Sequence, residues 1–189
     1  MTHRLVVTQN TTLDGRIELL DSWFDPSPQD RDVADLQEEM DRQGNATAAM
    51  LLGRRTFEDF RGYWPQHTDE PAGASLARLQ KYVVSRSLGD PGWQNSHVLA
   101  GEPLDEVRRL KASGEGDLVV TGSLTLTHAI LAAGLVEEVR LFVHPAVQGR
   151  GRGLVAEGTP PPSLTLLESR TFRAGVVLLR YAVGDASVS

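Results

Sequence analysis

The fold is decided by residues 49–59, which read Ala49-Met50-Leu51-Leu52-Gly53-Arg54-Arg55-Thr56-Phe57-Glu58-Asp59. The first four residues are apolar, enough for one short buried strand, and Gly53 ends the run. Two arginines then lead to Thr56, a residue that can begin a helix. A strand that turns into a helix presents backbone N–H groups to an anion, so we interpret the stretch as a phosphate-binding turn. The alternative is an ordinary turn with solvated arginines, which this short pattern alone favours slightly.

Two other segments repeat this arrangement. Residues 81–87 read Lys81-Tyr82-Val83-Val84-Ser85-Arg86-Ser87 and predict a short strand that ends in two hydroxyls and a cation. Residues 117–121 predict a buried strand, after which Gly122-Ser123-Leu124-Thr125 leads into a helix. Because parallel strands bind ligands at their carboxyl ends, we expect the three segments to form one site.

The groups at these three strand ends predict the kind of ligand. Two helix N-termini can bind a pyrophosphate, because their free N–H groups and helix dipoles attract anions. Arg54 and Arg86 come from neighbouring strands and can both bind one further phosphate through charge-assisted hydrogen bonds. A dinucleotide that carries an additional phosphate fits this set of groups.

Three segments between the strands carry simple predictions. Residues 30–43 predict an amphipathic helix whose acids form a solvated face and which ends at Gly44. Residues 66–75, with Pro71 and Gly73, predict a surface loop. Trp23 and Phe24 lie beside prolines in a loop, where they either close the sheet edge or line a pocket.

The order of the elements predicts the fold class. Strand and helix patterns alternate along most of the chain, and residues 164–172 and 176–183 predict a terminal β-hairpin. We therefore expect an α/β fold whose central sheet is mainly parallel, flanked by helices and closed by a C-terminal antiparallel hairpin. The prediction is a single domain over residues 1–184 with a frayed tail at 185–189.

Composition excludes several function classes. The chain has 189 residues, a formal net charge of -6 and no cysteine. The negative charge argues against a general nucleic-acid or membrane-surface binder, so phosphate recognition has to be local. The lack of cysteine excludes disulfides, and no apolar segment approaches the roughly 20 residues that span a bilayer. A soluble cytoplasmic protein with a small-molecule substrate is the simplest interpretation.

Two further patterns argue against a metal site and against a second dinucleotide-binding motif. The five histidines lack H-x-x-x-H spacing, so we expect no metal site. The segment Gly149-Arg150-Gly151-Arg152-Gly153 contains a G-x-G pattern, but no helical periodicity follows it. We interpret it as a flexible loop, with the hypothesis that its two arginines contact a phosphorylated substrate.

The residues also resemble a known family. Residues 52–58, 84–86 and 120–123 are similar to the strand ends of dihydrofolate reductases. The similarity to the reductase domain of bacterial riboflavin biosynthesis, and to its small stand-alone relatives, is closer. It is carried, in family order, by Thr12-Leu13-Asp14-Gly15, by residues 131–139 (Leu-Ala-Ala-Gly-Leu-Val-Glu-Glu-Val), and by residues 144–151 (His-Pro-Ala-Val-Gln-Gly-Arg-Gly).

The resemblance implies a dihydrofolate reductase-like fold that binds NADPH, and it gives roles to particular positions. Bound cofactor phosphates would lie at Gly53, Arg54, Arg55, Thr56, Ser85, Arg86, Gly122, Ser123, Leu124 and Thr125. Within that set, Arg54 would bind the 2′-phosphate together with Ser85 and Arg86, whereas Arg55 has no separate role. The resemblance also implies that Asp14 and Gly15 lie beside the nicotinamide and that Trp23 and Trp64 border the substrate cavity. Asp14 is equally well interpreted as a turn residue or as a catalytic one.

Departures from the family define the functional hypotheses. Dihydrofolate reductases carry a pterin-binding carboxylate on their first helix, and the acids of residues 30–43 share no motif with it. The riboflavin enzyme carries a zinc-binding deaminase domain and an acidic substrate motif that are not found here. Our first hypothesis is an NADPH-dependent reductase of a small heterocycle, either pterin-like or ribosylaminouracil-like. The alternative is a non-catalytic NADPH-binding module for sensing or assembly. A homodimer is a further expectation, from the resemblance and from the apolar terminal hairpin.

Overall fold

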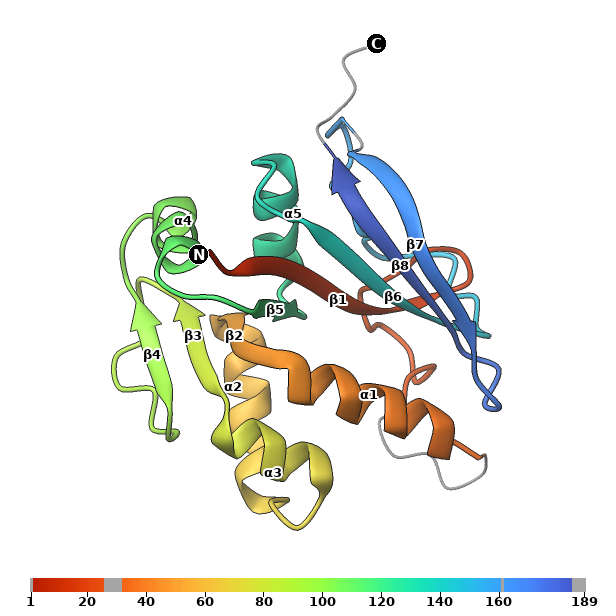
Figure 1. The fold of residues 1–189 in the computed structure, drawn as a ribbon, viewed down its shortest axis with the longest axis horizontal. Helices are drawn as coiled ribbons and strands as arrows, with labels where there is room; N and C mark the ends of the chain where they lie inside the picture. The colour runs from red at the N-terminus through yellow and green to blue at the C-terminus, as the bar shows by residue number, and fades with distance from the viewer. Residues whose placement is uncertain (1, 26–31, 161, 185–189) are drawn as a thin grey trace.

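In the computed structural model, which describes residues 2–25, 32–160 and 162–184, eight strands form one sheet (Figure 1). Their order across the sheet is β4-β3-β2-β5-β1-β6-β8-β7. The strands are β1 (Arg4–Thr12), β2 (Thr47–Gly53), β3 (Gln80–Val84), β4 (Ser96–Leu99), β5 (Asp117–Thr121), β6 (Glu138–His144), β7 (Ser163–Thr171) and β8 (Val177–Gly184). Neighbouring strands from β4 to β6 run parallel, whereas β8 is antiparallel to β6 and β7 is antiparallel to β8. The predicted fold class is therefore confirmed. The predicted tail at 185–189 lies outside the described residues.

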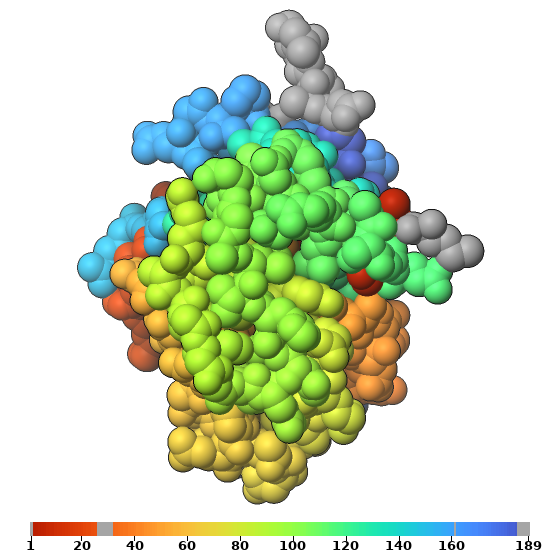
Figure 2. Space-filling model, turned by 90° about the vertical axis from the view of Figure 1, so that its left-hand side faces the viewer, coloured from red at the N-terminus to blue at the C-terminus, as the bar shows by residue number. Residues whose placement is uncertain are grey.

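Helices cover both faces of this sheet (Figure 1). They are α1 (Ala34–Ala46), α2 (Arg54–Tyr63), a 3-10 turn η1 (Trp64–Gln66), α3 (Pro71–Arg78), α4 (Pro103–Ala112) and α5 (Leu124–Ala132). One apolar core forms where α4 and α5 pack on the sheet, and it includes Val107 and Ile130. A second core forms on the other side of β2 and β3, where Phe57 of α2 packs with Met50 and Leu52. In Figure 2, the green segments that contain β4 and α4 form most of the visible surface, with the yellow α3 region below them.

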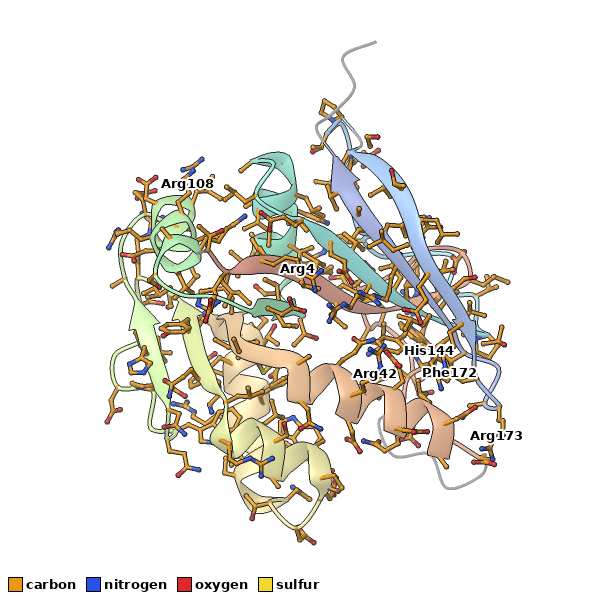
Figure 3. The ribbon with its side chains drawn as sticks, viewed as in Figure 1. Arg4, Arg42, Arg108, His144, Phe172 and Arg173 are labelled. Carbon is orange, nitrogen blue, oxygen red and sulfur yellow. The ribbon has the colours of Figure 1, made fainter. Side chains whose placement is uncertain are left out.

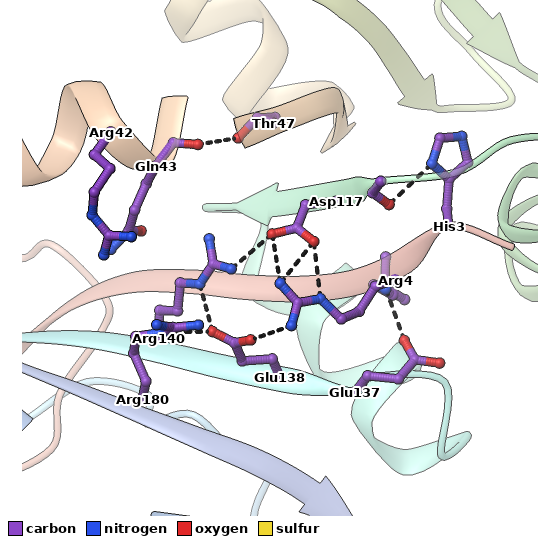
Figure 4. A network of polar contacts seen from close by, with 12 residues as sticks. His3, Arg4, Arg42, Gln43, Thr47, Asp117, Glu137, Glu138, Arg140 and Arg180 are labelled. Atoms are coloured by element: carbon purple, nitrogen blue, oxygen red, sulfur yellow. Dashed lines mark hydrogen bonds and ion pairs between the residues drawn. The ribbon is translucent and has the colours of Figure 1, made fainter. Parts of the chain in front are cut away.

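Ionic contacts join the amino ends of three central strands. Arg4 and Asp117 are paired in the β1–β5 register, and Arg4 Nη2 lies 2.8 Å from Asp117 Oδ1. Arg4 also contacts Glu138, which receives hydrogen bonds from Arg140 Nε at 2.7 Å and Arg180 Nε at 2.8 Å (Figure 4). Burial raises the pKa of the Glu138 carboxyl, but the hydrogen bonds from Arg180 and Arg140 outweigh this and hold the pKa below its usual value. The Glu138 carboxylate therefore remains ionised although it is buried, at the edge of the sheet opposite to the strands' carboxyl ends.

Helix α1 differs from its prediction at both its end and its buried face. It continues through Gly44 to Ala46, because the backbone N–H and Oγ1 of Thr47 bond the carbonyls of Gly44 and Gln43 and close the helix there. The prediction that its acids form a solvated face is wrong for Glu39, whose side chain is 0% exposed. Arg42 and Arg170 of β7 pair with this carboxylate, at 2.6 and 2.9 Å.

The same helix is attached to the terminal hairpin by further charges. Arg173, in the turn between β7 and β8, lies 2.6 Å from Asp32 and 3.6 Å from Asp35 (Figure 3). Its backbone N–H also donates to Asp35 Oδ2. Ion pairs, rather than apolar packing alone, therefore hold α1 against the hairpin.

Two other boundaries differ from the sequence prediction. Residues 66–75 are not all loop, because α3 begins at Pro71, where the ring presets φ and the missing N–H needs no partner. Apolar packing of Leu76 in the second core stabilises this short helix. Helix α2 begins at Arg54, two residues before the predicted Thr56, with Gly53 in an extended conformation at the cap.

The helices in the part of the chain that the structure describes are too short or too polar to cross a membrane. The residues that the structure describes contain no group of three or more His, Asp or Glu side chains arranged to hold a metal ion.

Candidate functional site

The three predicted strand ends lie next to one another at the carboxyl edge of the sheet. Strand β2 lies between β3 and β5. Gly53, the last residue of β2, pairs with Val84, which immediately precedes Ser85. On the other side, Leu51 of β2 pairs with Val120 of β5, two residues before Gly122. Parallel pairing therefore brings the segments that begin at Gly53, Ser85 and Gly122 together.

Two of these turns are in direct contact. A Cβ added to Gly53 would lie 2.8 Å from the Cβ of Ser123, and one added to Gly122 would lie 2.7 Å from Cγ2 of Thr56. Both distances are too short for carbon atoms, so both positions require glycine. Gly122 and Ser123 also have φ of 64° and 51°, in the left-handed region. These close approaches bring the N-termini of α2 and α5 side by side.

Both helix N-termini have free backbone donors. Neither Gly53 nor Ser123, the N-cap residues of α2 and α5, caps its helix with a side-chain hydrogen bond. The first N–H groups of a helix have no partner within it, and here they belong to Arg54 and Arg55 in α2 and to Leu124 and Thr125 in α5. A pyrophosphate fits two adjacent helix N-termini, because the N–H groups and the dipoles act in the same direction.

Arg54 and Arg86, which are predicted to bind the same phosphate, are each paired with a glutamate at the surface. Arg54 Nη1 lies 3.2 Å from Glu58 on the same helix, and Arg86 Nη1 lies 3.2 Å from Glu102. The Arg54 and Arg86 side chains are 50% and 69% exposed. Surface pairs of this kind contribute little, roughly 0 to 1 kcal/mol, so a phosphate dianion can displace them.

Ser85 and Arg55 are placed differently from one another. Ser85 is 8% exposed, and its Oγ accepts hydrogen bonds from the backbone N–H groups of Ser87 and Leu88. It therefore shapes the turn that carries Arg86. Arg55 is exposed on the first turn of α2.

Asp14 holds two loops together. Its carboxylate accepts hydrogen bonds from the hydroxyl of Thr12 at 2.6 Å and from the backbone N–H groups of Gln148 and Gly149 at 3.1 and 2.8 Å. The hydrogen bonds from Thr12 and Gln148 lower the pKa of Asp14 to about 2. Gly15, with φ of 77°, makes the turn that follows. Asp14 is thus ionised at neutral pH and supports the loop that follows β6. Its catalytic role stays a prediction.

The loop of residues 149–153 is attached to residues 16–21 by several contacts that the sequence did not reveal. Arg150 pairs with Asp21 at 2.8 Å, and Arg152 pairs with Glu18 at 2.6 Å. Next to this loop, Gln148 Oε1 accepts a hydrogen bond from the indole N–H of Trp23, and Gln148 Nε2 donates one to the carbonyl of Glu18. The only signal in the sequence is the opposite charge of the two loops, which does not identify pairs more than 100 residues apart.

The two tryptophans predicted to border the substrate lie in different clusters. Trp23 and Phe24 both contact the ring of His144, with centroids 5.5 Å away, at the carboxyl end of β6. Trp64 contacts Tyr63 and belongs to the periphery of the core under α2. Trp23 and Phe24 thus cover this end of the sheet, and the structure does not bring Trp23 and Trp64 together in one cluster.

A cavity of about 400 Å³ lies between α1 and α3 over the sheet. Its floor is formed by strand residues, namely Thr8, Met50, Val119, Arg140 and Phe142. Its walls come from α1, including Gln37, Met40 and Gly44, and from α3, including Ala72, Ser75 and Leu76. None of the residues predicted for the substrate pocket is among those that line it. Sequence reasoning missed this cavity, because its residues come from six separate elements.

Comparison with known proteins identifies the family. A family model described as the RibD C-terminal domain matches residues 4–178. An uncharacterised protein of Bacillus subtilis, YyaP, is 30% identical over 185 residues, which cover 94% of each chain.

Solved structures share the fold at lower identity. A putative riboflavin biosynthesis protein from Shewanella superposes with a TM-score of 0.71 at 18% identity, over 97% of this chain and 99% of that one. A diaminohydroxyphosphoribosylaminopyrimidine deaminase/5-amino-6-(5-phosphoribosylamino)uracil reductase from Thermotoga maritima superposes with a TM-score of 0.62 at 15% identity. That match covers 97% of this chain but 57% of the Thermotoga chain. The chain therefore belongs to the family of the RibD C-terminal domain, as its resemblance to the riboflavin-pathway reductase domain predicted.

Proposed function

We infer that the protein is an NADPH-dependent reductase that delivers a hydride to a small heterocycle, pterin-like or ribosylaminouracil-like. Membership of the RibD C-terminal domain family supports a reductase of the riboflavin-pathway type. The cofactor and the hydride transfer are our proposal for this chain.

One observation carries the proposal: the N-termini of α2 and α5 touch through Gly53 and Ser123 at the carboxyl edge of the sheet. Both helices begin without a side-chain cap, which leaves backbone donors for a pyrophosphate. Arg54 and Arg86 follow neighbouring strands on the same edge, where both can bind a 2′-phosphate.

The residues of the chain have a positioning role in this proposal. When bound, NADPH supplies a hydride to the carbon of a C=N or C=O bond and leaves as NADP⁺, while the nitrogen or oxygen takes a proton from water. Gly53, Thr56 and residues 122–125 hold the cofactor phosphates. Asp14 fixes the neighbouring loop, and its low pKa makes it unsuited to donate the proton at neutral pH.

Two measurements on the purified protein test this function. The first is the affinity for NADPH and NADH by fluorescence titration, where we expect NADPH to bind more tightly. The second is loss of NADPH absorbance in the presence of pterin-like and ribosylaminouracil-like compounds. Tight NADPH binding without oxidation by any compound of either class would support the non-catalytic module instead. Equal binding of both nucleotides would contradict the assignment of the phosphate site.

The hairpin surface supports a homodimer as part of the proposal. Strand β7 is the outer strand of the sheet, and Leu164, Leu166 and Leu167 on it are 43%, 53% and 52% exposed. Exposed apolar side chains on an outer strand favour association with another chain. Sedimentation analysis should give a dimer, and Leu166→Lys should give a monomer; a monomeric wild-type protein would contradict it. We further propose that the protein works in the cytoplasm, and a chain without cysteine is compatible with that reducing compartment.

A further inference from the structure

We propose that Gln148 is a positioning residue of the reductase, whose side-chain amide holds residues 16–23 in the conformation that receives the nicotinamide end of NADPH. The inference rests on the proposed function and adds a residue that lies outside the groups proposed to bind the cofactor phosphates. Gln148 acts through the loop that it holds. Its loss should therefore alter the nicotinamide end of the site and leave the phosphate end unchanged.

The proposed phosphate contacts set the direction in which a bound NADPH extends along the sheet edge. Arg54 and Arg86 follow β2 and β3, so in this arrangement the 2′-phosphate and its adenosine lie on that side. The pyrophosphate comes next, at the N-termini of α2 and α5. The nicotinamide is at the opposite end of the dinucleotide. It therefore extends away from β2 and towards β1, the strand beyond β5 in the sheet.

The loops after β1 and β6 lie at that end of the site. Thr8 pairs with Thr121, the last residue of β5, whereas β1 continues to Thr12 and stays paired with β6 as far as that residue (Figure 1). The two strands therefore project past β5 by about four residues, or roughly 13 Å at ~3.3 Å per residue. The β1 loop (residues 13–23) and the β6 loop (residues 145–153) begin there, beside the proposed pyrophosphate site.

The side-chain amide of Gln148 joins these two loops. Its Oε1 accepts hydrogen bonds from the backbone N–H of Leu20 at 3.3 Å and from the indole N–H of Trp23 at 2.8 Å. Its Nε2 donates to the carbonyls of Glu18 and Arg150, at 2.9 and 2.7 Å. A primary amide has two N–H groups to donate and two lone pairs on oxygen, so this amide uses its full capacity. Three of the four partners belong to the β1 loop.

The β6 loop is a fixed support for this amide. The carboxylate of Asp14 accepts a hydrogen bond from the backbone N–H of Gln148 at 3.1 Å. Nε2 of His128 lies 2.8 Å from the carbonyl oxygen of Gly153, which attaches the loop to α5, the helix proposed to bind the pyrophosphate. Gly151, with φ of 92°, leaves room for the amide, because a Cβ there would lie 2.9 Å from Gln148 Nε2.

Gln148 supplies most of the polar contacts that hold residues 19–23. No hydrogen bond between backbone groups joins these residues to another segment of the chain that the structure describes. A further polar contact, the ion pair of Asp21 with Arg150, has side chains that are 50% and 65% exposed, so water and salt weaken it. Without Gln148, the two N–H groups bonded to its Oε1 lose their acceptor. NADPH then has to order the loop itself, which costs affinity.

Two ligands separate the two ends of the site. NADPH has a nicotinamide, whereas 2′-phospho-ADP-ribose carries the same 2′-phosphate and pyrophosphate without it; each is titrated calorimetrically into the full-length protein. Gln148→Leu keeps the approximate size of the side chain and removes its hydrogen bonds. We expect it to weaken NADPH binding about three- to tenfold and to leave 2′-phospho-ADP-ribose binding unchanged. A general loss of structure would weaken both ligands.

A matched control and a second measurement complete the design. Gln94→Leu makes the same change at an exposed glutamine whose Nε2 donates to the carbonyl of Ala77, and it should affect neither ligand. Acrylamide quenching of bound NADPH fluorescence should increase in Gln148→Leu, because the nicotinamide is then less enclosed. If Gln148→Leu does not fold, Gln148→Asn replaces it, since its amide is one methylene shorter and cannot reach all four partners.

The outcomes separate this proposal from the proposed function. If the Gln148 variant binds both ligands as the wild type does, or weakens both equally, the positioning role is overturned while the NADPH site stands. An unchanged quenching of bound NADPH would contradict it as well. If the wild-type protein binds neither ligand, the proposed function is wrong and the role of Gln148 in it falls too.

Discussion

Gly53 and Ser123 lie against each other where the turns after β2 and β5 meet, and a Cβ built on Gly53 would be 2.8 Å from the Cβ of Ser123. Two carbon atoms cannot approach so closely. The pairing of the two helix N-termini, on which the cofactor proposal depends, therefore requires a missing side chain at residue 53.

Substitution of this glycine should damage the site. We expect Gly53→Ala to lower the free energy of unfolding by about 1 to 3 kcal/mol, the usual cost of an overpacked contact, and to weaken NADPH binding. Adding Ser123→Gly removes the opposing atoms and should restore much of both. Gly62→Ala is the matched control on α2, because a Cβ there meets no atom within 4 Å. Chemical denaturation and fluorescence titration measure the two effects; a Gly53→Ala protein that behaves like Gly62→Ala contradicts the steric argument.

The two exposed arginines should set the cofactor preference. We expect Arg54→Ala and Arg86→Ala each to weaken NADPH binding by on the order of 1.5 to 3 kcal/mol, because a charge-assisted hydrogen bond to the 2′-phosphate is lost. NADH binding should hardly change, since NADH lacks that phosphate. Arg108→Ala is a suitable control, because Arg108 is 52% exposed and also pairs with a carboxylate of its own helix. A double variant that still prefers NADPH would show that other groups bind the 2′-phosphate.

Asp14 should stabilise the fold down to low pH. Its pKa is about 2 in the folded protein against an ordinary value of 3.8, so the carboxylate contributes stability above pH 3.8 that is lost as the pH falls through 2. We expect Asp14→Asn to lower Tm at neutral pH. As the pH falls below 3.8, the difference in Tm between the variant and the wild type should become progressively smaller. Calorimetry from neutral to acidic pH measures this; a difference that persists at the lowest pH would mean that ionisation of Asp14 is irrelevant.

The buried acid of α1 should matter more than an exposed one. Glu39→Gln leaves Arg42 and Arg170 without their carboxylate, and we expect a loss of about 1.5 to 3 kcal/mol in the free energy of unfolding. Asp41→Asn, an exposed acid on the same helix that bonds Gln37, should cost less than about 0.5 kcal/mol. Urea denaturation of both variants gives the comparison. Equal effects would show that the ion pairs between α1 and the hairpin do not stabilise the fold.

Lys81 should make the protein more stable at alkaline pH. Its side chain is 0% exposed, with Nζ donating to the carbonyls of Leu76 and Leu79 at 2.7 Å and lying 4.4 Å from the ring centroid of Trp93. Burial lowers the pKa of Lys81 from 10.5 to about 8 in the folded protein. Between these two pH values the lysine is protonated in the unfolded chain but largely neutral in the folded one, so the free energy of unfolding rises with pH. Lys81→Met should lack this rise. If the stability difference between the two proteins does not change between pH 8 and 10.5, the lysine is not desolvated as described.

Periodicity and strand ends could be predicted because they depend on neighbours in the chain. The strand at Asp117–Thr121 has the bounds that its apolar run indicates. Alternation of such runs with helical patterns gave the parallel sheet, and parallel pairing then gathers the predicted phosphate-binding segments at one edge. The resemblance in residues 144–151 led to the right family.

The sequence by itself thus determined the fold class, the family and the edge of the sheet where a phosphorylated ligand is to be sought. Only the tertiary structure decided which charges are buried, what Asp14 holds, and where a cavity opens. Glu39 looked like a solvated acid because its partner Arg170 lies 131 residues away, and Asp14 meets Gly149 across 135 residues. Apolar periodicity is a local property of the chain, whereas the ionisation and burial of a polar group depend on partners that only folding brings within hydrogen-bond distance.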